Sequence, residues 1–232
     1  MKKHLAAVET TVATEERTTS GEQALHRDKT IENGSLLQTS HGGGVIVLQW
    51  LSYAFWFWFA VSMTWLAGVV INFYITAGQQ YNWADALAYP LSAVIIMFIM
   101  ALITDYFYAK YEPPRKQGIA YIIMLLHVVP FILVAIGALV AVVFSLLTML
   151  LNSNPANTID GPLQVLWTAV VMVILFGVLA MRAFLGGKNI AIRRTTWAVF
   201  GIMALGGIVA AIAGPAAEAS RTKQDRLIES AL

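Results

Sequence analysis

The feature that most restricts the fold is a series of long apolar segments between residues 45 and 215. They lie at about residues 46–75, 84–110, 117–151, 163–184 and 195–214. Each reaches or exceeds the roughly 18 apolar residues that a helix needs to cross a bilayer. Lipid offers no hydrogen-bond partners, so a chain crosses it only as helices or as a closed barrel, and a barrel needs short alternating segments that are absent here. The sequence therefore predicts an all-α, polytopic helical membrane protein with about five transmembrane helices.

The composition agrees with this class and excludes several functions. Charged residues make up 12% of the 232 residues, about half the share found in soluble domains. A formal net charge of +2 is too small to indicate a nucleic-acid partner. The chain has no cysteine and no HExxH or similar ligand pattern, so we expect no disulfide, no metal site and no cofactor.

The two ends of the chain differ from the apolar region. Residues 1–44 are rich in Thr, Glu, Ser and Gly, and they bury too little apolar surface to offset chain entropy, so we expect a disordered tail. No apolar segment follows Lys2 and Lys3, which predicts that the first spanning helix, rather than a signal peptide, directs insertion. The fifth segment is expected to stop at Ala213–Pro215, leaving residues 216–232 as a short C-terminal tail.

Basic residues in the short loops predict the orientation, because Lys and Arg are enriched on the cytoplasmic side. The connections around 76–83 and 152–162 contain neither Lys nor Arg. The other two connections, with their edges, contain seven: Lys110, Arg115, Lys116, Arg182, Lys188, Arg193 and Arg194. This asymmetry predicts a cytoplasmic N-terminus in the plasma (inner) membrane of a bacterium. The basic C-terminal tail opposes a five-span count, so four spans plus a surface or re-entrant segment stay open as the alternative.

Aromatic residues concentrate in the first apolar segment, where residues 53–59 read YAFWFWF. Trp and Tyr rings gather at membrane interfaces because an apolar body carries one group that hydrogen-bonds to water. This predicts an interfacial anchor made of Trp50, Tyr53, Trp56, Trp58, Tyr74 and Trp83. A slot for a quinone or haem is the alternative, but Gln49 and Ser52 are the only polar neighbours in the sequence.

Two ionisable residues are predicted to lie at membrane depth, where such groups are costly and often functional. His127 falls near mid-bilayer, and Pro130 three residues later is expected to kink the helix and free a carbonyl. His127 is then either a proton-relay or ligand-contacting residue, or a neutral ring bonded to a carbonyl or hydroxyl. Asp105 lies one to two turns inside the membrane. It either shares a polar path with His127 or pairs at the membrane edge with Lys110, Arg115 or Arg194.

Small residues and basic residues indicate the expected contacts. Gly206, Ala210 and Gly214 lie four apart, which predicts a face for close helix packing within the chain, in a homo-oligomer or against other membrane subunits. The basic residues of the two predicted cytoplasmic loops are expected to contact lipid headgroups. These are Arg115, Lys116, Arg193 and Arg194.

The stretch RKQGIAYIIMLLH (Arg115–His127) resembles a bacterial multi-span membrane family known only as a domain of unknown function. The shared features are a short basic loop and a helix that begins with a Tyr-x-x-x-Leu pattern. The resemblance covers about residues 45–185 and implies a membrane bundle. The family carries no established activity, so the resemblance implies no functional residue.

The sequence favours a non-enzymatic structural, accessory or partner-binding membrane subunit, because no nucleophile constellation and no paired carboxylates within the membrane are recognised. The first alternative is a small transporter or channel-like protein that uses His127 and Asp105 on a polar path. The second is a redox or lipid-enzyme subunit that uses the aromatic end of the first helix.

Overall fold

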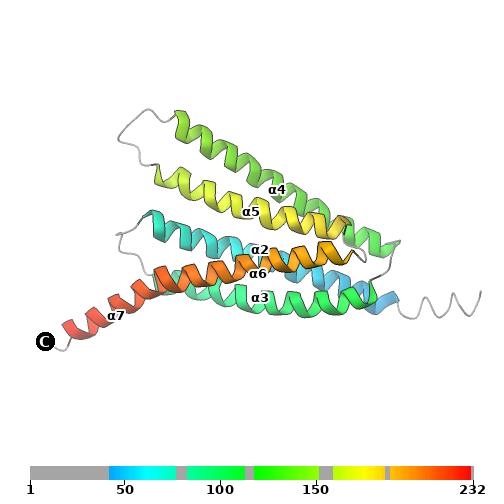
Figure 1. The fold of residues 1–232 in the computed structure, drawn as a ribbon, viewed down its shortest axis with the longest axis horizontal. Helices are drawn as coiled ribbons and strands as arrows, with labels where there is room; N and C mark the ends of the chain where they lie inside the picture. Colours follow the sequence, from blue (N-terminus) through cyan, green and yellow to red (C-terminus); the bar gives the residue numbers. More distant parts are fainter. Residues whose placement is uncertain (1–41, 77–82, 113–117, 152–158, 186–188, 231–232) are drawn as a thin grey trace, which may run out of the picture. The chain divides into compact units, whose positions relative to one another are not determined.

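The computed structural model describes residues 42–76, 83–112, 118–151, 159–185 and 189–230 (Figure 1). These ranges form α2 (Gly42–Ile75), α3 (Trp83–Tyr111), α4 (Ile119–Leu151), α5 (Asp160–Leu185), α6 (Ile190–Ala211), the π-helical segment η1 (Ile212–Ala216) and α7 (Ala217–Glu229). Five helical stretches in them are long and apolar enough to span a membrane, and the last runs from Ile190 to Glu229. The prediction of an all-α, five-span membrane protein is confirmed.

The helix boundaries lie within five residues of the predicted ones, except at the end of the last predicted segment. The α2 helix begins at Gly42, so three residues assigned to the disordered tail are helical. The rest of that predicted tail lies outside the described residues. The contacts described below all lie within the compact unit Ile46–Leu232.

Local chemistry accounts for several helix ends. The Asn189 side chain caps α6 by accepting hydrogen bonds from the backbone N–H groups of Ala191 (3.1 Å) and Ile192 (3.4 Å). Before α4, Gly118 adopts a φ of +58°, a left-handed conformation that a residue with a Cβ avoids. Acidic Asp85 and Asp160 lie in the first turns of α3 and α5, where they complement the helix dipole.

The predicted stop at Ala213–Pro215 is wrong, because the helix continues past it. Pro215 has no N–H to donate to a preceding carbonyl, and the backbone around it forms the wider π-helical turn η1. The hydroxyl of Tyr74 on α2 donates to the Ala210 carbonyl at 3.3 Å, next to this interruption. The chain then continues as α7, none of whose residues is buried. The predicted tail is therefore helical from Ala217 to Glu229.

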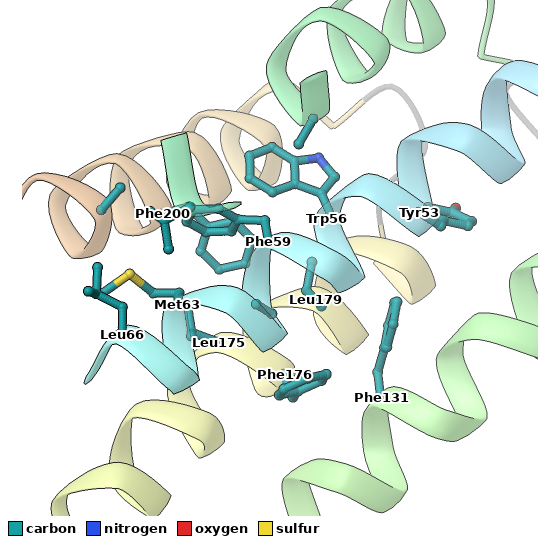
Figure 2. Packing of buried hydrophobic residues seen from close by; sticks show 14 of the residues in the cluster. Tyr53, Trp56, Phe59, Met63, Leu66, Phe131, Leu175, Phe176, Leu179 and Phe200 are labelled. Carbon is teal, nitrogen blue, oxygen red and sulfur yellow. The ribbon is translucent and has the colours of Figure 1, made fainter. Parts of the chain in front are cut away.

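The core forms along one face of α2. Its buried residues recur every three or four positions, as the helical period requires: Tyr53, Trp56, Phe59, Met63, Leu66 and Val70. Trp56 packs against Phe200 of α6 with ring centroids 4.8 Å apart, and Figure 2 shows these two rings beside Phe59. On another side of α2, Phe57 stacks on Phe131 of α4 at 6.1 Å and meets Phe176 of α5 edge-on at 6.0 Å. Aromatic packing thus joins α2 to α4, α5 and α6.

The aromatic-anchor prediction is wrong for three of its six residues. Tyr53, Trp56 and Trp83 are buried between helices, because they lie on the faces that α2 and α3 turn toward their neighbours. Trp50, Trp58 and Tyr74 are about half exposed, on faces that the bundle leaves uncovered. The YAFWFWF stretch therefore divides its rings between the core and the surface of the bundle.

Candidate functional site

The most polar buried site of the described residues centres on Asp105, which lies about two turns before the end of α3. Asp105 is 1% exposed. Its Oδ1 accepts hydrogen bonds from Arg182 Nη2 of α5 (2.9 Å) and from Ser52 Oγ of α2 (3.2 Å). Its Oδ2 accepts one from Trp197 Nε1 of α6 at 2.7 Å. Three donors from three other helices therefore converge on one carboxylate.

Arg182 brings a second carboxylate into the same site. The guanidinium is buried, and its Nη1 lies 3.8 Å from Oε2 of Glu112, which directly follows α3 and is also buried. Helical geometry explains the arrangement, since Asp105, Tyr108 and Glu112 follow one another at three- and four-residue spacing along one side of the chain. We call Ser52, Asp105, Glu112, Arg182 and Trp197 the Asp105 cluster.

Gln49 connects α2 to α4 near the Asp105 cluster. It lies one turn before Ser52 on α2 and is fully buried. Its Nε2 donates to the backbone carbonyl of Ala120, in the first turn of α4, at 2.9 Å. Polar side chains of α2 and α3 thus contact every other membrane-spanning helix at this end.

Among the described residues, the His127 ring makes no direct hydrogen bond or ion pair with the Asp105 cluster. Its Nδ1 lies 2.8 Å from the carbonyl oxygen of Ile123, one turn earlier on α4. Its ring is half-buried and lies 5.3 Å from the Tyr53 ring, which in turn lies 6.2 Å from the Tyr108 ring. The His127 ring is therefore placed to hydrogen-bond to the backbone of its own helix.

Pro130 lies within an α4 helix that continues on both sides of it. A proline removes the hydrogen bond to the carbonyl four residues earlier, here that of Leu126. His127 bonds to Ile123 instead, so it does not use the carbonyl that Pro130 frees.

The predicted basic residues fall into two groups. Arg193 is half-buried, with its guanidinium 5.7 Å from the centre of the Trp197 ring, while Arg194 is exposed. Arg115 and Lys116 lie outside the described residues. Lys110 is exposed, with its ammonium 5.5 Å from the centre of the Tyr111 ring.

The small residues of the predicted packing face, which lie in α6 and η1, have different surroundings in the structure. Gly214 lies against Phe73 and Tyr74 of α2, so closely that an added Cβ would come within 2.8 Å of the Tyr74 hydroxyl. Gly206 is exposed, and a Cβ there would meet nothing within 4 Å. Ala210, between them, is half-buried and gives its carbonyl to Tyr74.

The sequence identified Asp105 as a buried polar residue but assigned it the wrong partners. The predicted partners are Lys110, Arg115 or Arg194, whereas the structure pairs Asp105 with Arg182, which lies at the edge of a basic loop in the sequence. Glu112, the second carboxylate of the Asp105 cluster, is not among the predicted site residues. Gln49 and Ser52 were treated as incidental, although their three-residue spacing, shared with Tyr53 and Trp56, was a signal that they lie on the buried face of α2.

The helices and the Asp105 cluster together define a class: an integral membrane protein built as a helical bundle with a buried ion-pair network at one end. Comparison with protein-family models, with curated proteins and with solved structures finds no match for the chain.

Proposed function

We propose that the protein is a non-enzymatic structural or accessory subunit, multi-pass in a bacterial plasma membrane, with a cytoplasmic N-terminus. The observation that carries this proposal is the set of hydrogen bonds that Asp105 accepts from other helices. A carboxylate offers about four hydrogen-bond positions, and three of those on Asp105 are occupied by groups from other helices. A substrate or ion would have to displace these donors, so the site is better suited to holding helices together.

The expected partners follow from the surface. Lipid tails cover the exposed apolar faces, and anionic headgroups contact Arg193 and Arg194. The exposed part of α6 around Gly206 is the place where another membrane subunit, or a second copy, approaches most closely, because no side chain keeps the backbones apart there.

Two measurements on the full chain test the proposal. The first is proton flux in vesicles that contain the purified protein and an enclosed pH-sensitive dye. We expect the flux to equal that of empty vesicles. The second is native electrophoresis of membranes solubilised in mild detergent, in which we expect the chain to migrate in an assembly larger than the purified protein. Flux that disappears in His127→Phe, together with migration as a lone monomer, would contradict the proposal.

A transporter or channel-like role is the second candidate, and one observation favours it. The rings of His127, Tyr53 and Tyr108 follow one another at 5.3 Å and 6.2 Å, and Tyr108 lies one turn from Asp105 on α3. A path of this kind would connect the two intramembrane ionisable residues. The same vesicles distinguish the candidates, because Tyr53→Phe would lower the flux on such a path and would change nothing in an accessory subunit.

A further inference from the structure

The Arg182 side chain is buried with part of its hydrogen-bonding capacity unused. It is 2% exposed, and Nη2 donates to Asp105. Its Nε and Nη1 have no hydrogen-bond partner among the residues that the structure describes. The ion pair between Nη1 and Glu112 Oε2 spans 3.8 Å, which is too long for a direct hydrogen bond. A guanidinium carries five N–H donors and no acceptor, so leaving several of them unbonded inside a bundle is costly.

We propose that the space between Arg182 and Glu112 is a binding site for an internal water molecule. The bound group must accept a hydrogen bond from Nη1 and donate one to a carboxylate oxygen. A bridging water can complete a polar contact that is longer than about 3.5 Å, and buried waters usually satisfy polar groups that otherwise lack a partner. The water accepts from Arg182 and donates to Glu112 Oε2.

The charges of the Asp105 cluster exclude other small ligands. An inorganic anion would lie beside the carboxylates of Asp105 and Glu112, and a metal cation would lie beside the guanidinium of Arg182. Both placements bring like charges together in a poorly screened environment. A neutral molecule that both donates and accepts avoids both repulsions, and water is the smallest.

Gln49 supports hydration of this end of the bundle. Its Oε1 is buried and has no hydrogen-bond partner in the described part of the chain. The α2 and α3 helices run antiparallel, as the ring pairs Tyr53–Tyr108 and Phe73–Trp83 require. Gln49 and Glu112 therefore both lie toward the same end from the bond between Ser52 and Asp105. A second orphaned polar atom at the same end is the pattern expected where water enters the packing.

The first test is a map of the full-length protein in lipid at a resolution that shows ordered water elsewhere. The proposal predicts a peak at about 2.7–3.2 Å from both Nη1 and Oε2. A direct hydrogen bond between Nη1 and Oε2 with no peak beside it would overturn the proposal.

The second test is hydroxyl labelling by short X-ray pulses, which generate radicals from bound water within the protein. Tyr108 reports on the site, and Phe59 and Phe200 are matched controls, since all three are fully buried. We expect Tyr108 to be labelled several-fold faster than the two phenylalanines. Equal rates would contradict the proposal.

A pair of variants localises the water. Glu112→Gln retains an oxygen that accepts from water, so the labelling of Tyr108 should persist. Glu112→Leu removes the acceptor and fills the space, so the labelling should fall to the rate of Phe59. Persistence of fast labelling in a folded Glu112→Leu variant would show that the water does not lie between Arg182 and Glu112. If Glu112→Leu unfolds, all three residues label faster together, and the map decides.

Discussion

The carboxylate of Asp105 shows how a single residue can organise a membrane bundle. Removing an ionised group from water costs several kcal/mol, and only close partners recover this energy. Asp105 obtains those partners from α2, α5 and α6 at 3.2, 2.9 and 2.7 Å. The bond from Trp197 is the shortest of the three and is the only one that the described residues make to Oδ2, so it should contribute more than the longer bond from Ser52.

The two donors can be ranked by substitution. We expect Trp197→Phe to lower the free energy of unfolding by about 2 kcal/mol, because it keeps an aromatic ring and removes a donor to a charged group. Ser52→Ala should cost about 1 kcal/mol, since Oδ1 keeps its bond from Arg182. Unfolding by SDS titration in micelles, followed by tryptophan fluorescence, measures both.

Trp58→Phe is the control for the loss of ring size, because Trp58 is about half exposed and its side chain makes no hydrogen bond to the Asp105 cluster among the described residues. Its cost should stay within about 0.5 kcal/mol. An equal loss in Trp197→Phe and Trp58→Phe would mean that the Trp197 N–H is not important.

At the residue scale, the sequence predicts which ionisable residues lie within the membrane better than it predicts their hydrogen-bond and ion-pair partners. Counting residues from a helix end gave the depth of Asp105, and depth alone marked it as costly and therefore noteworthy. Which residue pairs with Asp105 depends on how α3 and α5 are rotated about their axes. Arg182 lies near a loop, where a basic side chain is usually expected to be exposed and unpaired. Glu112 was missed for the same reason.

At the scale of a helix, the last spanning stretch contains two glycines that differ in the space around them. Gly214 has the Phe73 and Tyr74 side chains at 2.8–3.0 Å from where a Cβ would lie, whereas Gly206 has open space. A methyl group at position 214 must push these rings aside, while one at position 206 only improves the helix propensity.

We therefore predict opposite signs for two identical substitutions. Gly214→Ala should destabilise the protein by about 1–3 kcal/mol through overpacking. Gly206→Ala should be neutral or stabilising by up to about 1 kcal/mol. The same SDS titration compares the two variants. A destabilising Gly206→Ala would mean that another chain packs on that face in the micelle, which native electrophoresis would reveal as loss of an oligomer.

The presence and length of the spanning helices were predictable from the sequence. In lipid, a long apolar segment can satisfy the hydrogen bonds of its own backbone N–H and C=O groups only as a helix. The end of the last helix was not predictable. Pro215 is a frequent stop signal, and its outcome depended on whether the neighbouring backbone could adopt a π-helical turn beside Tyr74.

At the scale of the whole molecule, the orientation in the membrane is the prediction that rests on sequence alone. The chain has no cysteine, so single cysteines can be introduced without background. With a membrane-impermeant maleimide applied to intact cells, Gln79→Cys and Asn154→Cys should be labelled. Gln117→Cys and Gly187→Cys should be labelled only after lysis. The reverse pattern would place the N-terminus outside.

The central claim is that the pairing of Asp105 with Arg182 holds the bundle together, and a double-mutant cycle tests it most directly. The measured quantity is the free energy of unfolding of Asp105→Leu, Arg182→Met and the double variant in lipid–detergent micelles. Each single substitution leaves a buried charge without its partner and should cost about 3–5 kcal/mol. The double variant should cost at least about 2 kcal/mol less than the sum of the two, as expected for residues in contact. Costs that add to within about 0.5 kcal/mol would contradict the account.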